Sequence, residues 1–565
     1  MTNLKQWMPI LQWLPNYQKS NLRGDMIAGL TVAMMLIPQA MSYAMLAGLP
    51  PIYGLYASMV PIIAYAIFGT SRELAVGPAA MVALLVSSAI SSLSPTSVEE
   101  YIWLAILLAG VVGIIQLLMG IFKLGFLTNF MSHPVISGFT SAAALIIIVS
   151  QLGHIFGLSL PRSENIFEIF SLMYSSLDDI SLPTLIIGLG SMALLVIFKV
   201  YLPKLPASML VLLGATVTVW LFNMEALGVS VVGFIPAGLP SPEVPELDFS
   251  RISEMLPVAI TIAFIGFIES IAVAKKIAQQ KRYELNANSE LVGLGMANIM
   301  GSLFQAMPVA GGFGRTAVNN NAGANTALAS IITVVFIILS LIFLTPLFYF
   351  IPKAVLGAII IMAVYGLIDM KEVFHLWKVK KEDLALLALT FIAVLFIGVK
   401  EGIFLGILSS MVWFVTKTTR PHYAVLGRLP GTSDYRNIKR HDVEVTDSVL
   451  ILRFDAQFYY GNVSFLKETI RRHQAEKGEV LKAVVIDACS INQLDSSADT
   501  ALHELIDEGE SQDIKYFFSY VKGPVQDVMH RSGFINRVGL DQFFNHIHAA
   551  VESANQYASA KNSEE

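Results

Sequence analysis

The 565-residue chain is 55 % hydrophobic and only 14 % charged, whereas soluble proteins are roughly 25 % charged. This composition excludes an ordinary water-soluble globule and indicates a membrane protein. Residues 1–440 carry 26 basic and 22 acidic side chains, and residues 441–565 carry 11 and 20. Neither part has the basic field that nucleic-acid binding requires, so no nucleic-acid partner is expected.

Residues 1–25 form a polar and amphipathic N-terminal segment, without the apolar core and cleavage site of a signal peptide. Residues 26–420 then contain apolar stretches, most of them long enough to cross about 30 Å of hydrocarbon as helices. They are expected near residues 26–46, 53–68, 78–93, 101–121, 126–155, 183–201, 206–223, 255–274, 287–305, 315–322, 325–350, 353–368, 383–399 and 401–418. These fourteen segments, two of them short, predict a polytopic α-helical transport domain embedded in a lipid bilayer.

Basic residues fall unevenly on the two sides of these segments. With a cytoplasmic N-terminus, the cytoplasmic side receives most of the Lys and Arg residues, and the opposite side receives mainly Asp and Glu. This asymmetry follows the positive-inside rule and predicts a multi-pass protein of the cell (inner) membrane with both termini in the cytoplasm. The single cysteine, Cys489, then lies in a reducing compartment.

Glycine and proline interrupt the apolar pattern at two places, Ala75-Val76-Gly77-Pro78 and Pro308-Val309-Ala310-Gly311-Gly312-Phe313-Gly314. Non-helical backbone at membrane depth is tolerated only where protein buries it or a water-filled cavity borders it, so each break predicts an interior site. The two breaks lie about 237 residues apart, which places seven segments in each half. An odd number inverts the second half relative to the first, as in many secondary transporters. The alternative is that glycine only allows close helix packing.

Two half-helices that start near Pro78 and Gly314 would direct their positive dipole ends and free N–H groups at one point, which suits an anion. Arg315 adds positive charge there, and the alternative is that it pairs with a nearby acid or carbonyl. Hydroxyl and amide groups nearby supply further donors, although polar side chains also join helices together. The predicted substrate-binding residues are Gln39, Tyr43, Gly77, Pro78, Ala79, Phe313, Gly314, Arg315 and Thr316.

Glu269 lies in one of the most apolar contexts of the chain, Phe264-Ile-Gly-Phe-Ile-Glu-Ser-Ile. Desolvation there disfavours the charged carboxylate, so the group is able to carry a proton or to coordinate a cation. We therefore predict that Glu269 couples transport to protons or sodium. The alternative is a salt bridge to Arg315.

Several motifs resemble the core signature of the SulP anion transporters, the sulfate permease family. They are Glu269 to Ala278, Tyr283 to Ser302, Arg315-Thr-Ala-Val-Asn319, Leu36-Ile-Pro-Gln-Ala-Met-Ser-Tyr-Ala44 and Gly48-Leu-Pro-Pro-Ile-Tyr-Gly-Leu-Tyr56. The resemblance covers nearly the whole chain. It implies a 7+7 inverted repeat with core and gate subdomains, a cytoplasmic STAS domain and a homodimer.

The same resemblance implies transport of sulfate, bicarbonate, chloride, oxalate or dicarboxylates by an elevator-like motion, often coupled to protons or sodium. The anion would lie between the helices that begin at Pro78 and Arg315, with Gln39 nearby, and Glu269 matches the acid associated with cation coupling. One departure concerns Gly314, because many members have Ser immediately before the arginine. The missing hydroxyl bears on which anion is bound.

Residues 441–555 have alternating strand and helix patterns and predict a small α/β domain, after a linker at 421–440 and before a disordered tail at 556–565. The stretch Leu494-Asp-Ser-Ser-Ala498 resembles the STAS signature, in which a serine is phosphorylated in anti-sigma-factor antagonists. Ser496 is thus a candidate regulatory site, and the resemblance leaves room for a cytosolic protein that binds the STAS domain. The alternative, which the sequence favours, is that Ser496 or Ser497 caps the helix.

Together these features predict a secondary active transporter of an inorganic oxyanion, with sulfate ahead of bicarbonate, and not an enzyme. The sequence has no metal-ligand spacing and no phosphate-binding Gly-x-x-x-x-Gly-Lys loop, so no cofactor is expected beyond the coupling ion, H⁺ or Na⁺. Three alternatives remain at this stage. They are a sodium-coupled bicarbonate or dicarboxylate transporter, an anion sensor that signals through its C-terminal domain, and a channel.

Overall fold

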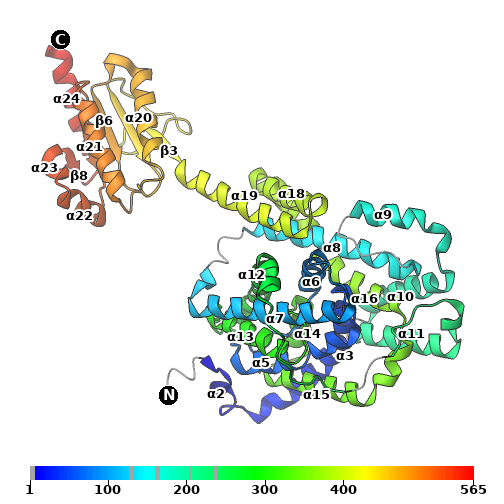
Figure 1. Ribbon diagram of the computed structural model, residues 1–565. Helices are drawn as coiled ribbons and strands as arrows, with labels where there is room; N and C mark the ends of the chain where they lie inside the picture. Colours follow the sequence, from blue (N-terminus) through cyan, green and yellow to red (C-terminus); the bar gives the residue numbers. More distant parts are fainter. Residues whose placement is uncertain (1–6, 127–131, 159–165, 203–204, 235–237, 565) are drawn as a thin grey trace. The chain divides into compact units, whose positions relative to one another are not determined.

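The computed structural model describes residues 7–126, 132–158, 166–202, 205–234 and 238–564 (Figure 1). The chain divides into a helical unit, Met1–Ser410, and a second unit, Met411–Glu565. Eight helices of the described residues are long and apolar enough to cross a membrane. Other apolar segments are shorter because glycine, proline or a strand interrupts them.

Within the described residues, fourteen helical segments form the two predicted repeats of seven. The first repeat contains α3 (Leu22–Leu46), α4 (Pro51–Tyr56) with α5 (Val60–Phe68), α6 (Ala80–Ser92), α7 (Val98–Ile121), α8 (His133–Phe156), α10 (Leu182–Tyr201) and α11 (Ala207–Leu221). The second contains α12 (Phe249–Gln280), α13 (Ala287–Ser302), α14 (Phe313–Asn321), α15 (Leu328–Phe343), α16 (Lys353–Val364), α18 (Lys381–Phe396) and α19 (Val399–Thr419). The short helices α9 (Ile166–Ser175) and α17 (Met370–Val379), which the sequence analysis did not predict, lie between these segments.

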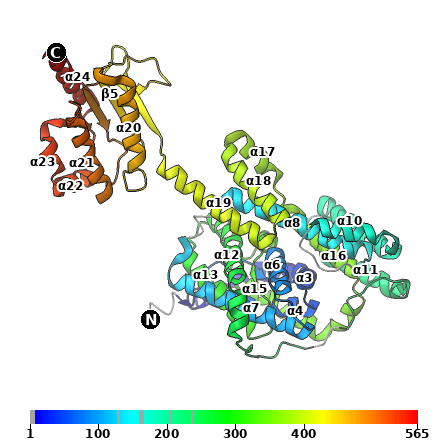
Figure 2. The same ribbon diagram turned by 45° about the horizontal axis from the view of Figure 1, so that its top comes forward.

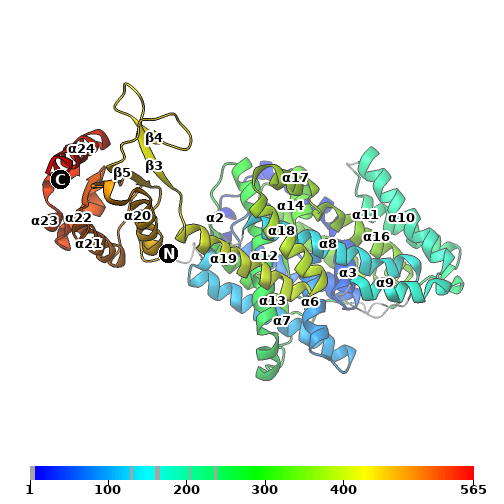
Figure 3. The ribbon, with the colours of Figure 1, turned by 90° about the horizontal axis from the view of Figure 1, so that it is seen from above.

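The helices of this unit pack into two groups. One group contains α5, α7, α12 and α13, and the other contains α8, α10, α16 and α18 (Figures 1 and 3). Helices α7 and α13 approach closely because glycines face each other. A Cβ on Gly113 would lie 2.8 Å from the carbonyl oxygen of Gly295, and the reverse distance is also 2.8 Å.

Both predicted breaks form short strands. Strand β1 (Val76–Gly77) precedes α6 and pairs antiparallel with β2 (Ala310–Gly311), which precedes α14. Val76 is opposite Gly311, and Gly77 is opposite Ala310. Equivalent elements of the two repeats therefore meet in the interior of the helical unit.

The second unit contains a six-stranded sheet in the order β4-β3-β5-β6-β7-β8. The strands are β3 (Tyr423–Arg428), β4 (Tyr435–Asn437), β5 (Val449–Phe454), β6 (Ala483–Asp487), β7 (Lys515–Ser519) and β8 (Phe543–Phe544), and β5 to β8 are parallel. Helices α20 (Val463–Lys477), α21 (Ser496–Glu510), α22 (Gly523–Arg531) and α23 (Phe534–Val538) share an apolar core with Leu450 and Leu452 on one face. Helix α24 (Ile547–Glu564) packs against Val449 and Ile451 on the other face.

Two predicted boundaries of this unit are wrong. The expected linker at 421–440 contains β3 and β4, because β3 pairs antiparallel with β5 and extends the sheet. The expected disordered tail at 556–565 continues as helix α24 to Glu564. Its sequence is polar overall, but Ala554 and Ala558 are buried against the sheet, and this apolar face orders the helix.

Candidate functional site

Backbone hydrogen bonds continue the β1–β2 pairing into the start of α14. The Gly312 N–H donates to the Ala75 carbonyl at 3.1 Å, and the Ala75 N–H donates to the Thr316 hydroxyl oxygen at 3.1 Å. That hydroxyl in turn donates to the Gly312 carbonyl at 2.7 Å. In this arrangement Thr316 holds the backbone of both breaks together, and its only proton is already engaged.

Two further side chains hold β2 in place. The Gly311 N–H donates to the Ser270 hydroxyl of α12 at 2.7 Å. The amide of Asn298, on α13, accepts from the Val309 N–H at 2.8 Å and donates to the side-chain oxygen of Gln116 at 2.9 Å. Ser270 and Asn298 lie within the motifs that resemble the family signature, but their roles could not be predicted because their partners are distant in the chain.

Arg315 lies where the two half-helices meet. Its side chain is 3 % exposed, and Nη1 donates to the Pro78 carbonyl at 2.5 Å. Its Nε and Nη2 atoms are buried and have no hydrogen-bond partner among the described residues. Two guanidinium donors are therefore free for a ligand that accepts hydrogen bonds.

Glycines make room for this guanidinium. A Cβ on Gly312 would lie 2.7 Å from both Cζ and Nη2 of Arg315, and a Cβ on Gly77 would lie 3.6 Å from Nη2. Gly77 also adopts a φ of +152°, which side-chain-bearing residues rarely adopt. The glycines of both breaks thus admit the arginine as well as interrupting the helices.

Glu269 is partly buried on α12, one residue before Ser270. Its Oε2 atom is enclosed and has no hydrogen-bond partner in the described part of the chain. Within the described residues, no ion pair within 4.0 Å joins Glu269 to Arg315, so the predicted alternative of a salt bridge is not formed in this state.

The remaining predicted residues lie on the elements around the two breaks, some buried and some exposed. Gln39 and Tyr43 are 5 % and 6 % exposed on α3, which packs against both α6 and α14. Ala79 is the extended residue immediately before α6. Phe313 is 48 % exposed, and the Lys276 ammonium lies 5.6 Å from the centroid of its ring. A Cβ on Gly314 would meet no atom within 4 Å, so this position faces open space.

Contacts of the buried Glu73 stabilise the chain before β1. Glu73 pairs with Lys281 at 3.0 Å and accepts a hydrogen bond from the Tyr283 hydroxyl at 2.6 Å. Its backbone carbonyl accepts a hydrogen bond at 2.8 Å from the side-chain amide of Asn319, which lies in the last turn of α14. These contacts hold the chain before β1 against α14 and against the residues that follow α12. The sequence did not predict them.

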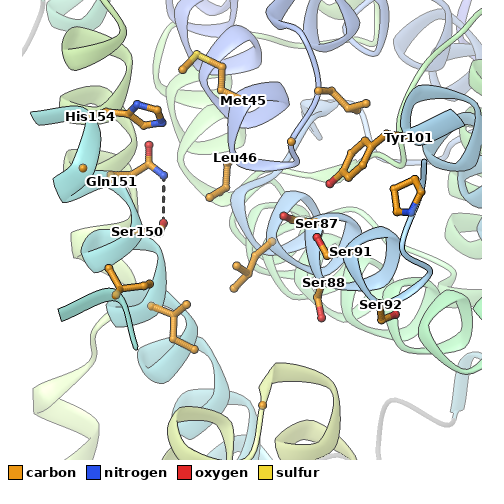
Figure 4. A pocket seen from close by; sticks show the side chains of 18 of the residues that line it. Met45, Leu46, Ser87, Ser88, Ser91, Ser92, Tyr101, Ser150, Gln151 and His154 are labelled. Carbon is orange, nitrogen blue, oxygen red and sulfur yellow. Dashed lines mark hydrogen bonds between the residues drawn. The ribbon is translucent and has the colours of Figure 1, made fainter. Parts of the chain in front are cut away.

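A cavity of about 1220 Å³ lies beside the candidate site (Figure 4). The residues of α6 that line it begin at Leu84, one turn after the start of that helix. Neither Arg315 nor Glu269 is among the lining residues. Hydroxyl groups of α6 line one side, and residues of α8 line the other: Ser87, Ser88, Ser91 and Ser92 face Ser150, Gln151 and His154 (Figure 4). The cavity has a mixed lining, in which the hydroxyl groups of α6 lie farther along that helix than its start near Arg315, and its volume is sufficient for a solvated ion.

The candidate regulatory residue lies in the second unit. Ser496 is exposed and is the first residue of α21, but Asp495 caps this helix by accepting from the Ala498 N–H at 2.8 Å. The favoured alternative, in which a serine caps the helix, is wrong because the aspartate occupies the N-cap position. The hydroxyl of Ser496 is therefore not required for the cap.

Comparison with known proteins agrees with this architecture. The profile of the sulfate permease family matches residues 22–390, and that of the STAS domain matches residues 440–554. The chain is 41 % identical over 577 residues to "Sulfate transporter 4.1, chloroplastic" of Arabidopsis thaliana, covering 99 % of this chain and 84 % of that protein. It is 32 % identical over 549 residues to "Probable sulfate transporter MT1781" of Mycobacterium tuberculosis, covering 97 % and 98 %.

Two solved structures share the fold. That of SLC26A9 has a TM-score of 0.90 at 24 % identity and covers 100 % of this chain and 94 % of that one. The transmembrane domain of the cyanobacterial bicarbonate transporter BicA has a TM-score of 0.60 at 24 % identity, with coverage of 70 % and 98 %. At this level of identity the two structures show the fold alone, and the predicted fold class is confirmed.

Proposed function

The chain belongs to the sulfate permease family, and from this premise we propose that it is a secondary active transporter that takes up sulfate, coupled to protons. As a member of that family it is an anion transporter and not an enzyme. The proposed site lies between the starts of α6 and α14, with Arg315, Gln39 and Tyr43 around the anion. We further propose a homodimer in the cell membrane, with both chain termini in the cytoplasm.

The observation that carries this proposal is the pair of unpartnered donors on buried Arg315. A buried guanidinium without a counter-charge is costly, and a bound anion removes that cost. The first N–H groups of α6 and α14 also lack partners within their helices and add favourable dipole ends. Sulfate suits such a site because it is a dianion with four oxygens that accept hydrogen bonds.

Proton coupling is supported by the position of Glu269. A carboxylate near the bound dianion would repel it, whereas the protonated acid is neutral and donates a hydrogen bond. Protonation of Glu269 would therefore favour sulfate binding, and release of the proton would favour sulfate release. Sodium beside the carboxylate would neutralise it in the same way and is the second coupling ion to test.

The deciding experiment is uptake of labelled sulfate into proteoliposomes that contain the purified protein. The proton gradient and the sodium gradient are imposed independently, and bicarbonate, chloride and dicarboxylates are added as competitors. We expect saturable accumulation of sulfate that requires the proton gradient. Accumulation driven by sodium alone would refute proton coupling, and flux that neither saturates nor concentrates sulfate would indicate a channel.

The open space around Gly314 favours one second candidate. A residue without a side chain at this position leaves room for a longer anion, such as a dicarboxylate. If sulfate does not enter and a dicarboxylate does, the substrate assignment changes while the site stays the same. Restoring a hydroxyl with Gly314→Ser should then shift the preference toward the smaller anion.

A further inference from the structure

Helix α17 presents an apolar stripe that no other described part of the helical unit covers. Of its ten residues only Leu376 is buried. Met370, Phe374 and Trp377 are 55 %, 64 % and 64 % exposed. At 3.6 residues per turn these three side chains fall within about 60° of one another around the helix.

Basic residues border this stripe on one side. Lys371 and Lys378 are exposed, fall within about 20° of each other and lie roughly 80° from the centre of the stripe. Lys381, also exposed, follows at the first residue of α18. A short helix with an apolar stripe and lysines along its border is typical of a helix that lies in the plane of a membrane interface.

The surroundings of α17 point to the bilayer rather than to a soluble partner. The helix connects α16 with α18, two segments of the membrane-spanning bundle, and packs beside α18 (Figure 2). Leu389 and Ile392 of α18 are 41 % and 53 % exposed, so that helix also presents apolar side chains outward. Exposed apolar side chains on two adjacent elements of a membrane-spanning bundle are suited to the same bilayer.

Helix α17 is also attached to the group of helices around α8. The side chain of Glu372 lies 3.2 Å from Nδ1 of His133, the first residue of α8. The Asp369 N–H donates to the Ser141 hydroxyl of α8 at 3.4 Å. These contacts attach α17 to α8 as well as to α18.

We propose that α17 lies in the membrane interface, where Met370, Phe374 and Trp377 insert among the acyl chains. Lys371, Lys378 and Lys381 bind the phosphates of anionic phospholipids. The stems of these lysines are long enough to reach the headgroups while the apolar stripe stays in the membrane. Anionic lipid bound here anchors the α8, α16 and α18 group to one leaflet, independently of the transported anion.

The lysines are tested by counting bound phosphatidylglycerol on the purified full-length protein by native mass spectrometry, with phosphatidylcholine as the neutral reference. The variant K371Q/K378Q/K381Q is compared with R436Q/K439Q/R440Q, which removes three exposed charges from the second unit. We expect roughly a hundredfold weaker phosphatidylglycerol binding in the first variant, equivalent to about 2.7 kcal/mol, and no change in the second. The proposal would be overturned if neither variant lost phosphatidylglycerol binding, or if both lost it equally.

The insertion is tested separately with brominated phospholipids, which quench tryptophan fluorescence within the bilayer. The chain has six tryptophans, so the contribution of Trp377 is taken as the difference between the wild type and W377F. We expect this difference to be strongly quenched by bromine near the headgroups and weakly quenched by bromine near the chain ends. A Trp377 contribution quenched by aqueous iodide and not by either lipid would show that the stripe faces water or another protein.

Discussion

Replacing Arg315 by alanine distinguishes the effect of this buried cation on protein stability from its contribution to sulfate binding. The substitution removes the two unpartnered donors, Nε and Nη2, and the bond from Nη1 to the Pro78 carbonyl. A hydrogen bond from a charged donor contributes about 1.5–3 kcal/mol, so two such bonds to a bound sulfate contribute at least about 3 kcal/mol. We therefore expect R315A to bind sulfate at least about 100-fold more weakly than the wild type.

The stability of the empty protein should respond differently. Loss of the bond to Pro78 destabilises the interior, whereas removal of a buried and incompletely paired cation stabilises it. Because these effects oppose each other, Tm without sulfate should change little, while the rise in Tm that sulfate causes should disappear. The assay is thermal unfolding of the purified protein across a sulfate titration, together with calorimetric binding.

The control for this experiment is Arg251→Ala. Arg251 pairs with Glu100 at 2.9 Å near the start of α12, away from the two breaks, and its loss should leave sulfate binding unchanged. The reasoning would be refuted if folded R315A bound sulfate within tenfold of the wild type. A large drop in Tm without sulfate would instead show that the arginine serves the fold rather than the ligand.

Three further predictions concern the surroundings of the site and the second unit. Glu269→Gln mimics the protonated acid, so it should retain sulfate binding but lose uphill uptake in proteoliposomes; normal concentrative uptake by this variant would remove the coupling role. Ser270→Ala leaves the buried Gly311 N–H without its acceptor, at a cost of about 1–3 kcal/mol, and should lower both Tm and sulfate affinity. Ser42→Ala is the matched control because that buried hydroxyl donates only to Pro38 in its own helix, and equal effects of both substitutions would contradict the role given to Ser270. Asp495→Ala should lose about 1 kcal/mol of helix stability and speed hydrogen exchange at the Ala498 N–H, whereas Ser496→Ala should not; faster exchange in the serine variant would mean that the serine contributes to the cap.

The breaks in the helical pattern could be predicted from sequence because glycine and proline act locally. Gly77 and Pro78 end a helical pattern whatever their neighbours are, and so do the glycines from Gly311 to Gly314. The fourteen segments and their division into repeats follow from hydropathy for a similar reason. A binding role for Arg315 could also be predicted from its apolar context, because an arginine at membrane depth requires a partner or a ligand.

The contacts that organise the site could not be predicted in this way. Ser270 and Gly311 lie 41 residues apart, and Ala75 and Thr316 lie 241 apart, so their pairing depends on how the helices pack. The same limit explains the wrong linker, because β3 becomes a strand only by pairing with β5. The helical tail was missed because its buried face consists of alanines, which give a weak hydrophobic signal.

The β1–β2 pairing bears on how the site presents itself to the two sides of a membrane. Its register places Val76 opposite Gly311 and Gly77 opposite Ala310. The first residue of each strand therefore faces the second residue of the other, as a two-fold relation between the repeats requires. In the proposed site, an anion would therefore contact one helix start from each repeat, whichever side of the membrane it enters from. We expect similar intrinsic affinities in the two orientations of the site, so the imposed ion gradients, and not the binding geometry, would set the direction of net flux.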